Sequence, residues 1–92
     1  MLQEVIDLFL ESAPAIIKQI HDSLGSPEAL AEHSHALRGM SLQLGAKRVV
    51  AMAARLEGIG HSRNLDEAPT VFHSLRTAFE ETKPHLLALR KS

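Results

Sequence analysis

The sequence predicts an all-α protein, an antiparallel up-down four-helix bundle, from three observations. Its composition is 45% hydrophobic and 23% charged, as in soluble globular proteins, but only 3% aromatic, which suits a core of packed helices. Apolar side chains recur at the three- and four-residue spacing of amphipathic helices, without a competing strand pattern. Short loops separate four such segments, which favours antiparallel neighbours. The 92 residues are expected to form one domain over 1–92.

The first predicted helix occupies the residues before Gly25, a residue type that tolerates the left-handed turn after a helix. Pro14 lies inside this segment. We expect it to kink the helix rather than end it, because the apolar period resumes in phase. The predicted core positions of this helix are Leu2, Val5, Ile6, Phe9, Leu10, Ala13, Ile16, Ile17, Ile20 and Leu24.

The second predicted helix follows Ser26, a suitable N-cap, with Pro27 at its first position, and ends at Gly45. The third begins at Ala46 and should be broken by the stretch GHSRN at 60–64. The predicted core positions of these two helices are Leu30, Leu37, Met40, Leu44, Val49, Val50, Ala53, Leu56 and Ile59.

The fourth predicted helix can be capped by Asn64 or Asp66, and Pro84 should kink it. Its apolar stripe comprises Val71, Phe72, Leu75, Ala78, Phe79, Leu86 and Leu89.

The charge balance and the missing cysteines exclude several classes of function. Ten basic residues against eleven acidic ones give a net charge of −1, so nucleic acid is not an expected partner. The absence of cysteine excludes disulfides, thiolate metal sites and a thiol nucleophile. No apolar run approaches the roughly 18 residues that span a bilayer, and no signal peptide is visible. We therefore expect a cytoplasmic protein without direct membrane contact.

Two histidines, His33 and His35, lie one residue apart in the second predicted helix. At about 100° of rotation per residue, His33 points along the apolar stripe and His35 points away from it. Residues two apart do not share a helix face, so the two imidazoles cannot cooperate. We expect His33 to be partly buried and bonded to a neighbouring helix, and His35 to be exposed. The other four histidines should lie on or near the surface.

The helix face around His35 is unusual for a surface that contacts only solvent. Arg38 lies one turn on, Ala31 one turn before, and Gly39 and Leu42 occupy the same side. Glycine inside a helix costs about 1 kcal/mol relative to alanine, and Leu42 places an apolar side chain towards solvent. These residues predict an imidazole with a cleared neighbour, a nearby cation and an apolar patch for a partner.

An exposed imidazole beside a permanent cation is suited to accept a phosphoryl group. The ring nitrogen is a competent nucleophile, and the planar fork of Arg38 can pair with phosphate oxygens. The sequence contains no glycine-rich nucleotide loop, no carboxylate cluster for Mg²⁺ and no Ser-His-Asp set. The domain is thus predicted to carry a phosphoryl group without making one from ATP, and to have no cofactor of its own.

The stretch HALRG at 35–39 resembles the H-x-L-K-G signature of histidine phosphotransfer (HPt) domains, with Arg38 in place of the common lysine. MSLQLGA at 40–46, the pair Leu56–Glu57 and LFLESAP at 8–14 are also similar to family segments. The resemblance covers nearly the whole chain. It implies a four-helix bundle that shuttles phosphate between aspartates of receiver domains in a two-component phosphorelay.

Residue by residue, the resemblance implies that His35 is the phosphoacceptor and Arg38 the cation beside it. Gly39 matches the small residue that opens the site, and Gln43 the polar residue that helps to hold the second helix. Met40 departs from the usual serine or alanine and should only repack the bundle.

Leu42 stands where the family often has a small residue, which could narrow the choice of receiver. The expected partners are response regulator receiver domains, a hybrid sensor kinase, or both, with Mg²⁺ supplied by the receiver. The domain is expected to be a monomer, either free-standing or as the cytoplasmic C-terminal domain of a membrane-bound kinase.

Less specific interpretations remain open from the sequence alone. His35 could be a solvated histidine, Arg38 a surface arginine and Leu42 an ordinary exposed leucine, while Lys47 and Arg48 most simply begin a solvated helix face. A metal site is disfavoured, because no two histidines have the i,i+3 or i,i+4 spacing of ligands on one helix. The alternative function is a helical interaction module that keeps the HPt-like fold without its chemistry.

Overall fold

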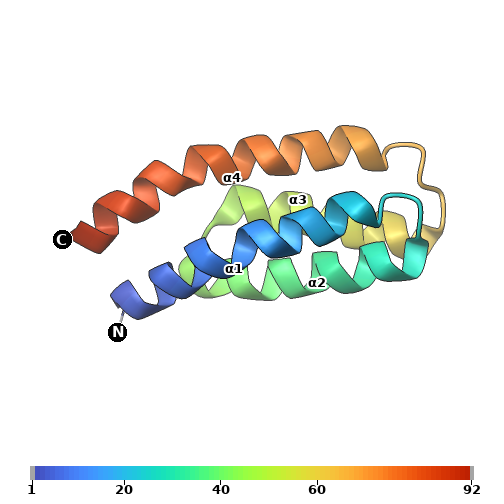
Figure 1. Cartoon of the computed structure of the whole chain (residues 1–92). Helices are drawn as coiled ribbons and strands as arrows, with labels where there is room; N and C mark the ends of the chain where they lie inside the picture. The colour runs from blue at the N-terminus through green and yellow to red at the C-terminus, as the bar shows by residue number, and fades with distance from the viewer. Residues whose placement is uncertain (1, 92) are drawn as a thin grey trace.

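The computed structural model describes residues 2–91, and the side chains of residues 3–90, which form an antiparallel four-helix bundle (Figure 1). The helices are α1 (Leu2–Asp22), α2 (Pro27–Leu44), α3 (Lys47–Ser62) and α4 (Ala68–Lys91). Each helix packs against its neighbours in sequence, and α1 closes the bundle against α4. Within the described part of the chain neither diagonal pair is in contact, so the predicted all-α up-down architecture is confirmed.

The core follows the predicted apolar stripes closely. Leu89, a predicted core position, is instead 50% exposed, because it lies in the last turns of α4. The side chain of Leu2 lies outside the described residues. The buried apolar core consists of Ile6, Phe9, Ala13, Ile17, Ile20, Leu30, Leu37, Ala46, Val49, Ala53, Leu56, Ala68, Val71, Phe72, Leu75, Ala78, Phe79 and Leu86.

The ends of α2 follow the expected capping chemistry in part. Pro27 opens the helix, and Ser26 precedes it in extended conformation without a side-chain cap hydrogen bond. Gly45 ends the helix with a left-handed φ of 68°, and its N–H donates to the carbonyl of Leu42 at 3.2 Å. This turn reverses the chain into α3 and thereby fixes the register of the α2–α3 pair.

Two helices end a few residues away from their predicted ends. α1 ends at Asp22, and Gly25 does not have the positive φ that was expected of it. α3 continues into the stretch predicted to break it, through Ser62, and ends within that stretch at Arg63, whose φ is 64°. The continuation is possible because Gly60 is buried in a helix contact rather than placed in a loop.

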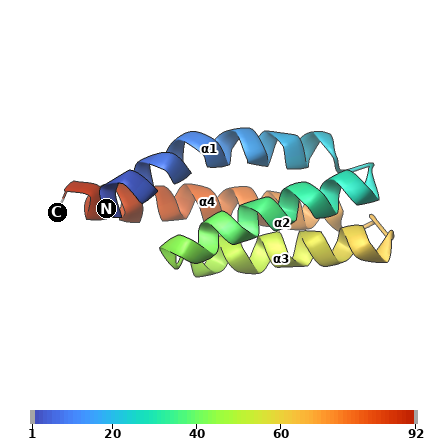
Figure 2. The same ribbon diagram turned by 90° about the horizontal axis from the view of Figure 1, so that it is seen from below.

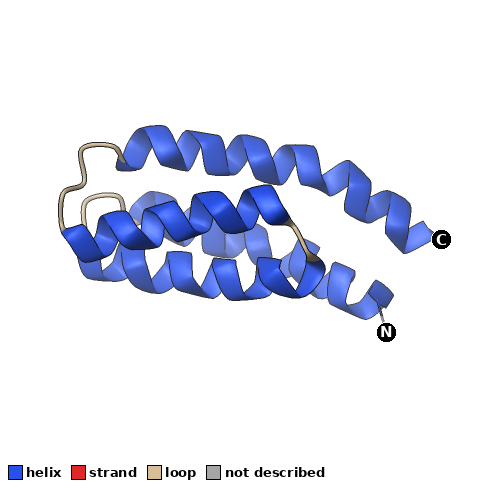
Figure 3. Ribbon diagram, turned by 180° about the vertical axis from the view of Figure 1, so that it is seen from behind, coloured by secondary structure: helices blue, strands red, loops and turns tan. Residues whose placement is uncertain are grey.

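Neither predicted cap of α4 occupies the N-cap position, because that helix begins at Ala68. The side-chain oxygen of Asn64 instead accepts a hydrogen bond from the backbone N–H of Asp66 at 3.2 Å. This contact stabilises a local turn within the α3–α4 loop, which is the longest of the three loops drawn in Figure 3.

The two longest helices, α1 and α4, both continue through an internal proline, as predicted. Pro14 lies inside α1 and Pro84 inside α4, and the ribbons of these helices bend (Figures 1 and 2). Their terminal parts extend together beyond the α2–α3 turn, and an ion pair of 3.0 Å between Arg90 Nη1 and Asp7 Oδ1 joins them. No helix in residues 2–91 is both long and apolar enough to cross a membrane.

α2 and α3 approach each other closely at Gly60. A Cβ atom at this position would lie 2.7 Å from the carbonyl oxygen of Pro27 and 2.8 Å from the backbone nitrogen of Ala31. Only a residue without a side chain allows the two backbones to come so near. This contact positions the surface of α3 against the middle of α2, where His35 lies.

Candidate functional site

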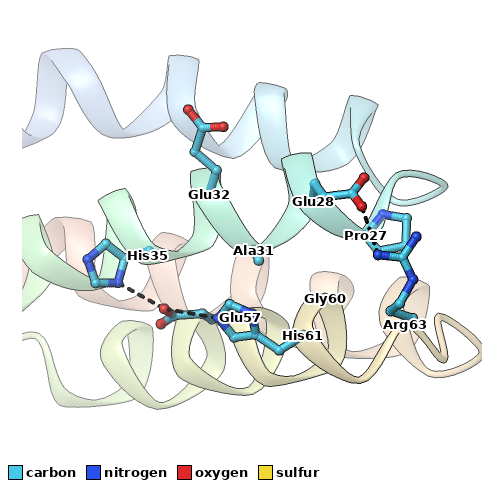
Figure 4. A pocket seen from close by; sticks show the side chains of 9 residues that line it. All are labelled: Pro27, Glu28, Ala31, Glu32, His35, Glu57, Gly60, His61 and Arg63. Carbon is cyan, nitrogen blue, oxygen red and sulfur yellow. Dashed lines mark hydrogen bonds and ion pairs between the residues drawn. The ribbon is translucent and has the colours of Figure 1, made fainter.

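His35 lies in the middle of α2 with 65% of its side chain exposed, as predicted. Its ring is turned towards α3, where Nδ1 lies 2.9 Å from Oε2 of Glu57 (Figure 4). The neighbouring helix therefore holds one nitrogen of the imidazole and leaves the rest of the ring accessible.

Glu57 and Arg38 form an ion pair beside this histidine. Arg38 Nε lies 2.9 Å from Oε1 of Glu57, and Arg38 Nη2 lies 3.1 Å from Nδ1 of His35. The Nε contact does not have the direction of a hydrogen bond, so it acts through charge. The Glu57 side chain is only 17% exposed. Each of its two oxygens thus faces a different partner, Arg38 on one side and His35 on the other.

The Glu57 carboxyl is ionised at neutral pH. Burial alone would raise its pKa from the ordinary value of 4.5, but the hydrogen bond from His35 and the positive charge of Arg38 outweigh burial and lower the pKa. An ionised carboxylate can only accept hydrogen bonds.

This charge state determines which ring nitrogen of His35 carries the proton. Because Glu57 must accept, Nδ1 donates to it, and Nδ1 cannot also accept a hydrogen bond from Arg38. The neutral imidazole has one donor and one acceptor nitrogen, so the lone pair resides on Nε2. The free lone pair therefore lies on the ring nitrogen that does not contact Glu57.

A hollow of about 420 Å³ opens beside His35 between α2 and α3 (Figure 4). Its apolar lining includes Pro27, Ala31 and Gly60, the residues of the close helix contact. At its far end Arg63 Nη1 lies 2.7 Å from Oε1 of Glu28, and this hydrogen bond and the arginine's charge lower the pKa of Glu28. The exposed imidazole thus borders an accessible concave surface.

The other predicted surface residues lie where a partner could reach them, with one exception. Leu42 is 57% exposed, and Gly39 is exposed as well. Gln43, which was expected to help to hold α2, is also exposed, and its side chain makes no hydrogen bond within residues 3–90. A Cβ atom on Gly39 would meet no atom within 4 Å, so intramolecular packing does not require glycine there. Ala31, which was expected in the partner-facing strip, is only 8% exposed.

Ala31 is buried because α3 packs against it. Its Cβ would lie 2.9 Å from a Cβ on Gly60, so α3 covers this part of α2. Helical rotation alone places Ala31 near His35 on the outer face, but it does not indicate which side of that face a neighbouring helix covers. Ala31 lines the hollow and does not project from the surface.

The remaining histidines and basic residues mostly match the predictions. His33 is half-buried, but its ring makes no hydrogen bond within residues 3–90, so the bond predicted for it is not found. Met40 packs against the core, and Lys47 and Arg48 are exposed. The four other histidines, His21, His61, His73 and His85, are all exposed, as predicted.

Two residues of the site, Glu57 and His61, have no role in the sequence-based prediction. His61 Nε2 lies 3.8 Å from Oε2 of Glu57, the same oxygen that His35 contacts. Glu57 follows His35 by 22 positions on a different helix, so helical rotation cannot bring the two together in a prediction. The sequence signal that could have indicated Glu57 was the pair Leu56–Glu57, in which a carboxylate follows a core residue of α3. Among the described residues no group of three or more His, Cys, Asp or Glu is arranged to hold a metal ion.

Comparison with known proteins gives one informative result. Searches of characterised proteins and of solved structures found no match. The family model for the Hpt domain, however, matches residues 4–85, which include all of the site. With its four-helix architecture and its exposed histidine, the chain belongs to the Hpt domain family, whose members carry out histidine phosphotransfer in two-component phosphorelays and whose partners are response regulator receivers.

Proposed function

We propose that His35 accepts a phosphoryl group at Nε2 from the aspartyl phosphate of a receiver domain, and passes it to, or returns it from, a response regulator receiver. The observation that supports this assignment is the 2.9 Å contact between His35 Nδ1 and the ionised Glu57. It leaves the lone pair on the exposed nitrogen and provides a negative charge on the opposite side of the ring.

The chemical step uses groups of this chain and of the receiver. The lone pair of Nε2 forms a bond to phosphorus while the bond between phosphorus and the aspartyl oxygen breaks, and the electron pair of that bond remains on the aspartate. The imidazole gains a positive charge because Nδ1 keeps its proton. Glu57 stabilises this charge through the hydrogen bond that already exists. Transfer to a second receiver is the reverse reaction with a different aspartate.

Arg38 is proposed to stabilise charge at this site. Its guanidinium already contacts Glu57 and lies beside His35, so it holds the carboxylate in place before transfer. Because its side chain is 34% exposed, unengaged donors can pair with phosphate oxygens after transfer. We expect the substitution Arg38→Ala to slow transfer roughly tenfold to a hundredfold, since a charge-assisted contact contributes about 1.5–3 kcal/mol.

The receiver is proposed to dock over the exposed strip that contains Gly39 and Leu42. The Mg²⁺ of the reaction is proposed to belong to the receiver, where it would neutralise the aspartyl phosphate. We further propose that the domain is a cytoplasmic monomer. It would act either by itself or as the C-terminal domain of a hybrid sensor kinase.

Incubation with a phosphorylated receiver tests the proposed acceptor. Wild type should gain an acid-labile, base-stable label, and His35→Gln should gain none while keeping its helical circular dichroism. His33→Gln is the matched control on the same helix and should label normally. Label that persists in His35→Gln would contradict the assignment, and an unlabelled wild type would favour the alternative of an interaction module without chemistry.

A binding titration tests the docking surface separately. An apolar side chain buried at an interface contributes about 1.5–3 kcal/mol, so Leu42→Asp should weaken receiver binding at least tenfold. Leu87→Asp is the control, because Leu87 is also an exposed leucine but lies on α4, diagonal to α2. If Leu42→Asp and Leu87→Asp both bind the receiver as tightly as wild type does, the receiver does not cover Leu42.

A further inference from the structure

The exposed face of α2 continues past His35 towards the beginning of the helix, where it carries two carboxylates. Glu32 lies three residues before His35, and Glu28 lies four residues before Glu32, the spacings that place side chains on one helix face. Both glutamates are exposed, and both border the hollow between α2 and α3 (Figure 4). The surface beside His35 is therefore acidic on this side, whereas Leu42 makes it apolar on the other side.

Glu32 is the carboxylate of this surface that has no counter-charge. Glu28 pairs with Arg63 at 2.7 Å, and Glu57 pairs with Arg38 at 2.9 Å. The side chain of Glu32 makes no ion pair or hydrogen bond within residues 3–90, and Figure 4 shows it pointing away from Glu57. A cation supplied by a partner would thus meet a free carboxylate at Glu32.

The floor of the hollow is apolar. Pro27, Ala31 and Gly60 line it at the point where the backbones of α2 and α3 approach most closely. The volume of the hollow, about 420 Å³, lies within the range of surface sites that receive a side chain or a small molecule. An apolar side chain of a partner would find apolar neighbours there and would leave water on entering.

A protein that reaches His35 must also cover Glu32 and the hollow. An ordinary protein–protein interface buries about 800 Å² on each partner, which corresponds to a disc of about 16 Å radius. A helix rises about 1.5 Å per residue, so Glu32 lies about 5 Å and Pro27 about 12 Å from His35 along α2. A carboxylate covered by a partner without a counter-charge is unfavourable, because it loses its water. The surface that covers Glu32 therefore needs a cation at this point.

We propose that Glu32 is a specificity-determining residue for the receiver, which presents a lysine or arginine to this carboxylate and places an apolar side chain in the hollow. This inference rests on the proposed docking of a receiver at His35. An ionic contact on one side of His35 and an apolar contact at Leu42 on the other differ in chemistry. The receiver can satisfy both in only one orientation, which is how complementary charge fixes the register of an interface.

A binding titration tests the charge contact. The unphosphorylated receiver of the transfer assay is titrated into wild type, Glu32→Gln, Glu32→Lys and the control Glu80→Lys. Glu80 is exposed on α4, which makes no contact with α2 among the described residues, and its substitution changes the net charge as much as Glu32→Lys does. The titrations are repeated in the His35→Gln background, so that docking is measured without transfer.

We expect Glu32→Gln to weaken binding roughly twofold to fivefold, the effect of losing one ion pair at an interface rim. Glu32→Lys should weaken it at least about tenfold, because two like charges then face each other, and added salt should reduce this loss. Glu80→Lys should bind as wild type does. Replacement of the receiver's exposed lysines and arginines, one at a time, should identify one whose loss weakens binding to wild type but not to Glu32→Gln.

Methyl NMR tests the occupancy of the hollow without a substitution. With ¹³C-methyl alanine in this domain and protonated receiver, the Ala31 methyl should show nuclear Overhauser effects to an apolar side chain of the receiver. The Ala51 methyl is the control, because it is exposed on α3 outside the hollow and should show none.

The outcomes separate this inference from the proposed function. If Glu32→Lys binds as tightly as wild type, or if Glu80→Lys loses as much affinity, Glu32 does not select the receiver. An Ala31 methyl without contacts in the saturated complex would overturn the occupancy of the hollow. Neither result prevents labelling of His35, so the proposed function would survive both. If the Glu32 variants behave as expected but His35 is not labelled, the docking inference stands and the proposed function fails. A receiver that labels His35 with equal kcat/KM in wild type and Glu32→Lys would overturn the docking inference alone.

Discussion

α2 and α3 approach each other so closely that a side chain on Gly60 would strike the backbone of α2, and they hold a charged cluster. α1 and α4 are longer, contain internal prolines and meet through apolar side chains, with the rings of Phe9 and Phe79 5.8 Å apart between centroids. The difference separates two tasks within one bundle. The α2–α3 pair holds polar groups within hydrogen-bond distance, and α1 and α4 provide much of the buried apolar surface.

The exposed leucines are distributed unevenly over the two helix pairs. Leu8, Leu87 and Leu89 belong to α1 and α4, whereas Leu42 is the only strongly exposed leucine of α2 and α3 in the described residues. An apolar side chain beside a charged site lowers the solubility of the surface without improving packing. Leu42 lies in the strip over which the receiver is proposed to dock.

The first prediction concerns the removal of apolar volume between α1 and α4. Phe9→Ala should lower the free energy of unfolding by about 3–5 kcal/mol, because Phe9 is only 2% exposed and packs against Phe79. Transfer per folded molecule should nevertheless stay near the wild-type rate, since α2 and α3 keep their contact. Urea denaturation together with a transfer assay at low temperature measures both. Lost transfer in a folded variant would show that the two pairs are not independent.

The second prediction concerns a substitution that forces α2 and α3 apart. Gly60→Ala places a Cβ 2.7 Å from the Pro27 carbonyl oxygen and should cost about 1–3 kcal/mol of stability, as overpacking does. It should also slow transfer, because Glu57 moves with α3. Gly58→Ala is the matched control on the same helix, where a Cβ would meet nothing within 4 Å, and it should be stabilising by up to about 1 kcal/mol. A Gly60→Ala variant as stable as wild type would contradict the close contact.

The sequence predicts the bundle well because its core depends on periodicity. Ile6, Phe9 and Ala13 are buried where helical spacing places them, and the same argument orients His35 away from the core. Such arguments concern one helix at a time. They predict His35 and Arg38, which share α2, as neighbours.

The part of the site that could not be predicted depends on contacts between helices. Glu57 reaches His35 because Gly60 lets α3 approach, and nothing in the local sequence distinguishes a glycine in a helix contact from one that breaks a helix. For the same reason Ala31 is buried, although its rotation about α2 places it near His35. Close approach is a property of two backbones together.

The third prediction concerns the charge of Glu57. Interaction with His35 and Arg38 lowers its folded pKa below the ordinary 4.5, so its contribution to stability is present above that value and is lost as the pH falls through the folded pKa. Glu57→Gln should thus be less stable than wild type near neutral pH, and the difference should vanish in strong acid. Urea midpoints of both proteins between pH 2 and 7 measure it. A difference that persists at pH 2 would mean that Glu57 acts by packing rather than by charge.

The last prediction compares two buried serines of α2. Ser34, next to His35, is fully buried and its hydroxyl has no hydrogen-bond partner among the described residues, whereas the buried Ser41 donates to the carbonyl of Leu37 at 2.8 Å. An unpaired buried hydroxyl costs about 1–3 kcal/mol, so Ser34→Ala should raise the free energy of unfolding by about 1 kcal/mol after the loss of packing. Ser41→Ala, which removes a satisfied hydroxyl, should instead be neutral or destabilising.

Urea denaturation of both serine variants at neutral pH decides between these expectations. A destabilised Ser34→Ala would show that the hydroxyl finds a partner in solution. If the variant is stabilised as expected, then α2 is less stable than its packing allows at the residue beside the proposed acceptor. Functional sites often retain such unfavourable groups. Measuring transfer by the same variant then shows whether the hydroxyl affects His35, because a merely structural serine would leave the rate unchanged.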